Sequence, residues 1–109
     1  MTPQERIDYL IKILEGNNAR EFADKCGIPP ASLSRIRNGR AEPVAYYTRI
    51  LAAYPAVRRE WLVSGRGEAL TERARRDRIE MQLARIEKKM EKVEELVAEL
   101  SRRVIDFEK

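Results

Sequence analysis

The stretch that decides the fold is residues 20–39, REFADKCGIPPASLSRIRNG. It holds two short helical patterns, separated by one glycine and two prolines. Gly27 suits the left-handed conformation that ends a helix. Pro30 suits the first position of the next helix, because its missing N–H would have no partner there. The second pattern leaves small polar and basic side chains on the faces that its apolar residues do not use. The stretch therefore predicts two helices joined by a tight turn.

Short helices are also expected on both sides of this turn. Thr2 and Glu5 have the capping-box spacing at the start of a first helix, and Gly16 ends that helix. Asn18 is a cap for the helix that Gly27 closes. A fourth helix begins at Pro43, and a short fifth helix follows. Their expected inward residues are Val44, Tyr47, Leu51 and Tyr54 in the fourth and Trp61 and Leu62 in the fifth. Five short helices predict a compact all-α domain over residues 1–67.

The C-terminal third follows a heptad pattern. Its apolar residues are separated alternately by four and three positions, and no Gly or Pro occurs from Thr71 onward. Such a stripe on an otherwise charged helix needs a partner helix. We expect residues 68–109 to form one long coiled-coil helix that joins copies of the chain; the alternative is a helix folded back on the first domain. The expected oligomerisation residues are Ile79, Leu83, Ile86, Met90, Val93, Val97, Leu100, Val104 and Phe107.

The charges beside this stripe favour a parallel arrangement. With Leu83 at a and Ile86 at d, a parallel pair sets Lys89 against Glu94 and Arg103 against Glu108. An antiparallel pair would instead set the glutamates at e against one another. Leu at a with Ile at d leans toward three or four strands. A dimer is therefore the minimum expected assembly, and a tetramer, as a dimer of dimers, is the alternative.

Several features in register carry a resemblance to a known family. Small or apolar residues occupy the positions where the two helices on either side of the turn would pack against each other. We call these residues the wedge: Phe22, Ala23, Cys26, Ile28, Leu33 and Ile36. Residues 36–43, IRNGRAEP, and 61–70, WLVSGRGEAL, follow in order. From about Ile7 to Leu70 the chain resembles the helix-turn-helix domain of the Cro/repressor (XRE-type) regulators of phages and bacteria. The resemblance implies a five-helix, lambda-repressor-like domain; the alternative is an ordinary αα-hairpin.

In such a domain the second helix of the motif lies in the DNA major groove. Leu33 and Ile36 would face inward, so the expected base-reading residues are Ala31, Ser32, Ser34 and Arg35. Arg35 is the first candidate, since a guanidinium can hold guanine O6 and N7 together. The resemblance also places the expected phosphate contacts at Asn18, Arg20, Arg37, Asn38 and Arg40, with Tyr46 or Tyr47 as further candidates. Many relatives have Gln at the start of both helices, where this chain has Asn18-Ala19 and Pro30-Ala31, so no base preference is carried over.

Composition narrows the class of function. The chain has 109 residues, a formal net charge of +4 and no histidine, which removes the commonest general base and metal ligand. We therefore expect no enzyme, cofactor or metal site. Cys26 is alone, so no internal disulfide can form, and no apolar run is long enough for a membrane span. The expected location is the bacterial host cytoplasm, at the nucleoid.

The expected function is a sequence-specific transcriptional regulator. The preferred form is a phage or prophage repressor that binds a palindromic operator in double-stranded DNA as a homo-oligomer. The alternatives are an antitoxin-type regulator of a toxin–antitoxin pair and a coiled-coil adaptor that no longer binds DNA. Residues 71–109 leave no room for the self-cleaving peptidase domain of larger phage repressors, so a separate antirepressor protein is the expected means of release.

Overall fold

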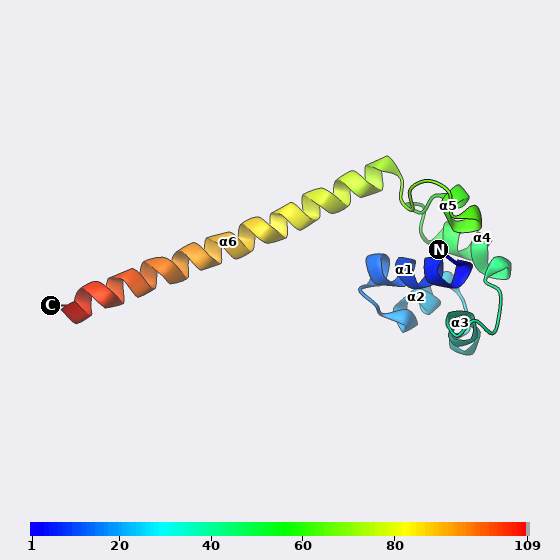
Figure 1. Cartoon of the computed structure of the whole chain (residues 1–109), viewed down its shortest axis with the longest axis horizontal. Helices are drawn as coiled ribbons and strands as arrows, with labels where there is room; N and C mark the ends of the chain where they lie inside the picture. Colours follow the sequence, from blue (N-terminus) through cyan, green and yellow to red (C-terminus); the bar gives the residue numbers. More distant parts are fainter. Residues whose placement is uncertain (109) are drawn as a thin grey trace. The chain divides into compact units, whose positions relative to one another are not determined.

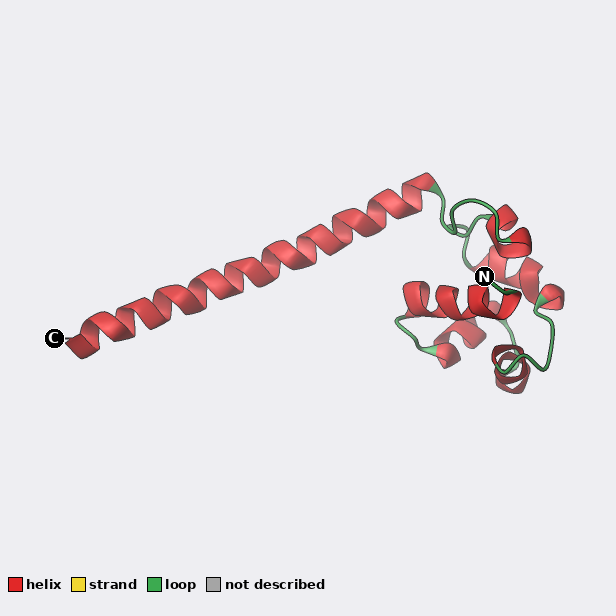
Figure 2. Ribbon diagram, viewed as in Figure 1, coloured by secondary structure: helices red, strands yellow, loops and turns green. Residues whose placement is uncertain are grey.

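The computed structural model describes residues 1–108, and the side chains of residues 1–106. Its regular elements are all helices (Figure 2), and an isolated antiparallel bridge joins Val57 to Leu70. In the order labelled in Figure 1, with a 3₁₀ turn at Val44–Tyr46, the helices are α1 (Pro3–Glu15), α2 (Ala19–Cys26), α3 (Pro30–Arg37), α4 (Tyr47–Ala53), α5 (Arg59–Ser64) and α6 (Glu72–Glu108). The prediction of an all-α fold ending in one long helix is confirmed.

Local caps fix the ends of the first two helices, as the sequence predicts. The Thr2 hydroxyl accepts from the Glu5 N–H at 3.1 Å, and the Glu5 carboxylate accepts from the Thr2 N–H at 3.2 Å. Gly16 ends α1 in the left-handed conformation, with φ at 57°. The Asn18 side chain then accepts from the Glu21 N–H at 3.1 Å and starts α2. Each cap satisfies a backbone group that the helix itself leaves without a partner.

The turn between α2 and α3 is closed by Gly27 and sealed by apolar side chains. Gly27 has φ at 66°, a conformation that a side chain would strain. The Ile28 N–H bonds back to the Ala23 carbonyl at 2.9 Å, and the Arg49 guanidinium of α4 donates to the Gly27 carbonyl at 2.9 Å. The six wedge residues are each 4% exposed or less: Phe22, Ala23, Cys26, Ile28, Leu33 and Ile36. The predicted wedge is therefore buried, and it fixes α3 against α2.

The start of the fourth helix differs from the prediction. Val44 is 63% exposed rather than inward, because residues 44–46 form a 3₁₀ turn and α4 begins only at Tyr47. A 3₁₀ helix has three residues per turn instead of 3.6, so its side chains point in other directions than those of an α-helix. The α-helical pattern of inward residues therefore starts at Tyr47, three residues later than expected. Tyr47 and Ile50 then face the core, at 8% and 1% exposed.

A buried arginine connects α1 to α5. Arg6 is 5% exposed, and its guanidinium donates to the carbonyls of Leu62 at 3.1 Å, Met1 at 3.1 Å and Val63 at 3.4 Å. Leu62 and Val63 belong to the last turn of α5, whose carbonyls have no partner within the helix. A cation is favourable at that end of a helix dipole. Gly65 makes room for it, since a Cβ there would lie 3.0 Å from the guanidinium.

A carboxylate joins three helices on another side of the core. Glu15, at the end of α1, accepts from Lys25 of α2 at 2.7 Å and from the Tyr54 hydroxyl at 2.7 Å. These two hydrogen bonds hold the pKa of Glu15 below its usual value, and the bond from Lys25 has the larger effect. The Tyr54 ring stacks on Phe22, with 5.5 Å between the ring centroids. This cluster holds α2 in place from both neighbouring helices.

The lone cysteine belongs to the core. Cys26 is 4% exposed, and burial raises the pKa of its thiol to about 11. A thiol is nucleophilic only as the thiolate, so Cys26 is inert at neutral pH.

The chain divides into two units, Met1–Thr71 and Glu72–Lys109. We refer to the first as the head and to α6 as the stalk. The head continues past the expected boundary at residue 67. Ala69 and Leu70 are buried, and the Arg58 N–H donates to the Ala69 carbonyl at 2.8 Å. Residues 69–71 therefore run beside residues 56–58 before the stalk begins.

The stalk is one uninterrupted helix of 37 residues, drawn from yellow-green to red in Figure 1. Its expected seam residues with described side chains, from Ile79 to Val104, are each between 52% and 58% exposed in the single chain. The side chain of the last one, Phe107, lies outside the described part. A continuous exposed apolar stripe on an isolated helix is the pattern of a surface that another helix covers.

Candidate nucleic-acid interface

The wedge turns one face of α3 outward. Leu33 and Ile36 are 3% and 1% exposed, because they complete the wedge against α2. Of the four expected base-reading residues, Ala31, Ser34 and Arg35 are exposed and Ser32 is half-buried. Three of the four are thus accessible on one short helix, and the Ser32 side chain is the least available.

Arg35 has the side chain with the greatest reach on that face. It is exposed, and among the described side chains of residues 1–106 and the backbone its guanidinium has neither an ion-pair partner nor a hydrogen-bond acceptor. By contrast, Arg37 on the same helix is engaged with another side chain. A guanidinium without an internal partner keeps its planar set of donors available for an external acceptor.

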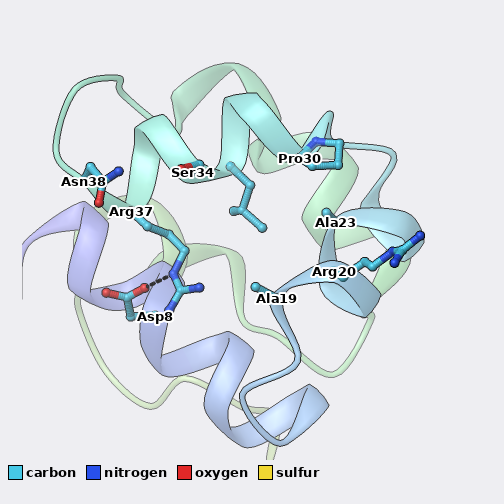
Figure 3. A pocket seen from close by; sticks show the side chains of 9 residues that line it. Asp8, Ala19, Arg20, Ala23, Pro30, Ser34, Arg37 and Asn38 are labelled. Atoms are coloured by element: carbon cyan, nitrogen blue, oxygen red, sulfur yellow. Dashed lines mark hydrogen bonds and ion pairs between the residues drawn. The ribbon is translucent and has the colours of Figure 1, made fainter.

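A groove of about 600 Å³ lies where α3 meets the start of α2 and the first half of α1 (Figure 3). It brings together four of the predicted DNA-contacting residues from two helices. The lining residues are Asp8, Ala19, Arg20, Ala23, Pro30, Leu33, Ser34, Arg37 and Asn38. The floor is made of small and apolar side chains, while the rim carries two guanidinium groups, the Asp8 carboxylate, a hydroxyl and an amide. That rim suits an anionic backbone better than a small neutral ligand.

An ion pair crosses this groove. Arg37 Nε of α3 donates to the Asp8 carboxylate of α1 at 2.8 Å, as Figure 3 shows, and both side chains are about two-fifths exposed. The Gln4 side chain donates to the backbone carbonyl of Arg37 from the same face of α1. These two contacts hold the end of α3 against α1. They also give Arg37 an internal partner that a phosphate would have to displace or share.

The other expected phosphate contacts are arranged around the groove or outside it. Arg20 lies at the rim and points away from the Asp8–Arg37 pair (Figure 3). Asn38 lines the groove, whereas Asn18 and Arg40 are exposed but do not. The Asn18 oxygen already caps α2, so a phosphate contact there would have to come from its amide nitrogen.

The two tyrosines differ in access. Tyr47 is 8% exposed and belongs to the core, which leaves Tyr46 as the tyrosine with access to a ligand. Arg49 lies over the Tyr46 ring, with 5.6 Å from its guanidinium carbon to the ring centroid. One face of the Tyr46 ring is therefore covered by the Arg49 guanidinium.

Sequence reasoning missed two residues that shape this interface, Asp8 and Gln4. Both lie on α1, about thirty residues from the arginine that they contact. No local pattern marks them, because their role follows only from the packing of α1 beside α3.

Comparison with known proteins gives a partial match. The chain is 37% identical over 62 residues to an "uncharacterized HTH-type transcriptional regulator" of Haemophilus influenzae. The matched part is 57% of this chain and about a quarter of the relative. No protein-family profile matches the chain, and no solved structure matches it. The likeness supports a helix-turn-helix regulator, and it agrees with the buried wedge and outward face of α3.

No helix among residues 1–108 has the length and apolarity of a membrane span. The described side chains of residues 1–106 contain no cluster of Cys, Asp or Glu that could hold a metal ion.

The Asp8–Arg37 pair leads to a prediction for DNA binding. Replacing Asp8 by Asn removes the charge that competes with a phosphate for Arg37. We expect tighter binding to any duplex, and a slope of log affinity against log salt that is steeper by about 0.9, the value for one more neutralised phosphate. Titration of a labelled duplex at several salt concentrations measures both.

Asp24→Asn is the matched control, because Asp24 is an exposed α2 aspartate outside the groove. Both variants raise the net charge by one, so only the local effect differs. An equal salt slope in the two variants would show that Arg37 does not reach the DNA.

Proposed function

We propose that this protein is a sequence-specific DNA-binding transcriptional regulator, and that it acts as a phage or prophage repressor on a palindromic operator. The observation that carries the proposal is the division of α3 into two faces. Leu33 and Ile36 are locked in the core, while Ala31, Ser34 and Arg35 are left outward on the same two turns. This is what a helix needs when it must be rigid and still present side chains to base edges.

The positions of three other polar side chains support the same function. Arg20, Arg37 and Asn38 border the groove beside α3, where a DNA strand would pass if α3 entered the major groove. Phosphate contacts fix the register of a protein on a duplex, and base contacts then read the sequence. A base-reading helix with phosphate donors on its flank provides both kinds of contact.

One head contacts few base pairs, so affinity at cellular salt needs a second head. In this proposal the second head is provided by a second copy of the chain, which is joined through the exposed seam of the stalk. Paired stalks make the second head's contact effectively intramolecular, which raises avidity by about 10²–10⁴. Two heads related by a two-fold axis read a palindrome, with half-site centres about 34–36 Å apart or a multiple of that distance.

The test begins with selection of bound duplexes from a random pool by the full chain. We expect an approximately palindromic consensus. On that operator, Arg35→Ala should weaken binding by about 1–3 kcal/mol, which is the usual value of a bidentate guanine contact, and relax the preference at one base of each half-site. Competition titration with the operator and with base-substituted operators measures both effects.

Arg59→Ala is the matched control, since Arg59 is an exposed arginine on α5 rather than on α3. Operator affinity should be unchanged in this variant. If selection returns no consensus, the chain is not a sequence-specific regulator, and the adaptor alternative is favoured. If the Arg35→Ala variant keeps full specificity, another residue of α3 reads the operator.

A further inference from the structure

The charges of the stalk are divided between its two halves. Residues 72–90 hold seven Lys and Arg against four Asp and Glu, whereas residues 91–108 hold three against six. The helix thus has a net charge of +3 in its first half and −3 in its second. Two stalks side by side in the same direction set like charges together, and two in opposite directions set unlike charges together.

One stripe of the helix carries this division most clearly. The c positions of the heptad are, in order, Arg78, Arg85, Lys92, Glu99 and Asp106, and we call them the c stripe. It adjoins the apolar seam through the g positions. Leu96, at g, is 51% exposed and extends the apolar surface toward the c stripe. This flank therefore combines one apolar residue at g, beside the polar Gln82, Lys89 and Arg103, with three basic residues at c followed by two acidic ones.

The apolar seam fixes a register for two stalks in opposite directions. Full overlap sets a positions against d positions, so that Leu83 meets Leu100 and Met90 meets Val93 of the other stalk. In the same register the c stripes face each other within one residue. Arg78 then lies opposite Asp106, and Arg85 opposite Glu99. The register that covers the whole seam thus also pairs four of the five charges of the c stripe, while Lys92 at its centre faces Lys92 of the other stalk.

The other flank does not favour this arrangement. Its e positions include Glu87 and Glu94, which would face each other in the same register. The charges therefore select the flank of the c stripe for opposed contact. In the single chain Glu99 accepts from Arg103 of its own helix at 2.7 Å, but that pair is exposed and weak. The Glu99 carboxylate can accept from Arg103 and from Arg85 of the opposed stalk at the same time.

We propose that two parallel pairs of stalks, running in opposite directions, share their seams in one four-stranded core and meet through the flank of the c stripe, giving a four-chain assembly. Leu83 at a with Ile86 at d supports this number of strands in the first half of the stalk, whereas Val97 at a with Leu100 at d is the pattern of two strands. Each head is joined to the first residue of its stalk, so two heads lie at each end of a four-stranded body roughly 55 Å long. This inference rests on the proposed function and adds a further activity to it. A single assembly binds two separate operators and bridges them.

Charge reversal on the c stripe tests the assembly in the full chain. The basic-end variant carries Arg78→Glu and Arg85→Glu, and the acidic-end variant carries Glu99→Arg and Asp106→Arg. Each should sediment as two chains where the unchanged protein sediments as four, with at least a tenfold rise in the concentration needed for the larger species. The variant with all four changes has the reversed stripe and should return to four chains. So should an equal mixture of the two double variants.

The matched control reverses two cations at f, on the side of the helix away from the seam. Lys88→Glu with Arg102→Glu makes the same change in net charge as the basic-end variant and should leave the four-chain species intact. Salt gives an independent readout, since the four-chain species should weaken between about 0.01 M and about 1 M salt as the Debye length falls from about 30 Å to 3 Å.

Bridging is measured with two duplexes carrying the selected operator, one of them immobilised and the other labelled. The unchanged protein should retain the labelled duplex, and both double variants should lose that retention while keeping single-operator affinity. Sedimentation needs no DNA, so its outcome is independent of the operator test. The proposal is overturned if the unchanged protein is a dimer at every concentration, if the double variants remain tetrameric, or if the four-change variant does not reassemble.

Discussion

Replacing Ile86 and Val93 by aspartate is expected to turn the protein into a single-chain species and to weaken operator binding by at least about 100-fold. Both residues are at d positions near the middle of the stalk and are more than half exposed in the single chain. In the paired state they would lie in the dry seam, where an unpaired carboxylate is strongly disfavoured. Loss of pairing removes the second head from the reach of its half-site.

The control for this prediction uses residues that look identical in the single chain. Met81 and Ile105 are 59% and 56% exposed, but they lie at f and b, away from the seam. Met81→Asp with Ile105→Asp lowers helix propensity at least as much and should leave the assembly intact. Sedimentation measures the number of chains in each double variant, and operator titration measures its affinity. Equal behaviour of the two would show that the seam does not join the chains.

Arg6→Ala is expected to destabilise the head by about 3 kcal/mol, because it removes a buried cation that donates to three backbone carbonyls. Two of these carbonyls end α5, and after truncation they face a gap between α1 and α5. For a domain of this size such a loss lowers the melting temperature by about 10 °C or more. Thermal and urea unfolding of the full chain, followed by the Trp61 signal, measure it.

Arg6→Lys separates charge from geometry in this prediction. Lysine keeps the charge, but its ammonium group is compact and cannot fan out to three carbonyls as a guanidinium does. We expect it to recover only part of the stability. Arg20→Ala, an exposed arginine on α2, should change stability by less than about 0.5 kcal/mol. A change equally small for Arg6→Ala would show that water replaces the guanidinium at little cost.

Helix ends and the wedge could be predicted from the sequence, because both are set by neighbours along the chain. Thr2, Asn18 and Gly27 act within one helical turn, and the alternation of four and three in the stalk is a repeat that the primary structure displays directly. Val44 does not face inward as the sequence predicts, because residues 44–46 form a 3₁₀ turn, and the spacing of apolar residues alone does not separate such a turn from the first turn of an α-helix.

The buried arginine and the bridged groove could not be predicted. In the sequence Arg6 is one charged residue among others at the start of a helix, and only the approach of α5 makes it internal. Asp8 and Arg37 are 29 residues apart, so their ion pair exists only once α1 lies beside α3. The candidate site was predicted as a set of exposed α3 residues, and the structure adds which of them have internal partners.

The inert thiol of Cys26 makes the chain a convenient host for site-selective labelling. Buried and protonated at neutral pH, it should not compete with a new cysteine for a maleimide dye. A single cysteine at Ser101, which is exposed on the stalk, would then carry a donor or an acceptor fluorophore without altering the head. Energy transfer between differently labelled copies would follow subunit exchange in real time, on DNA and off it.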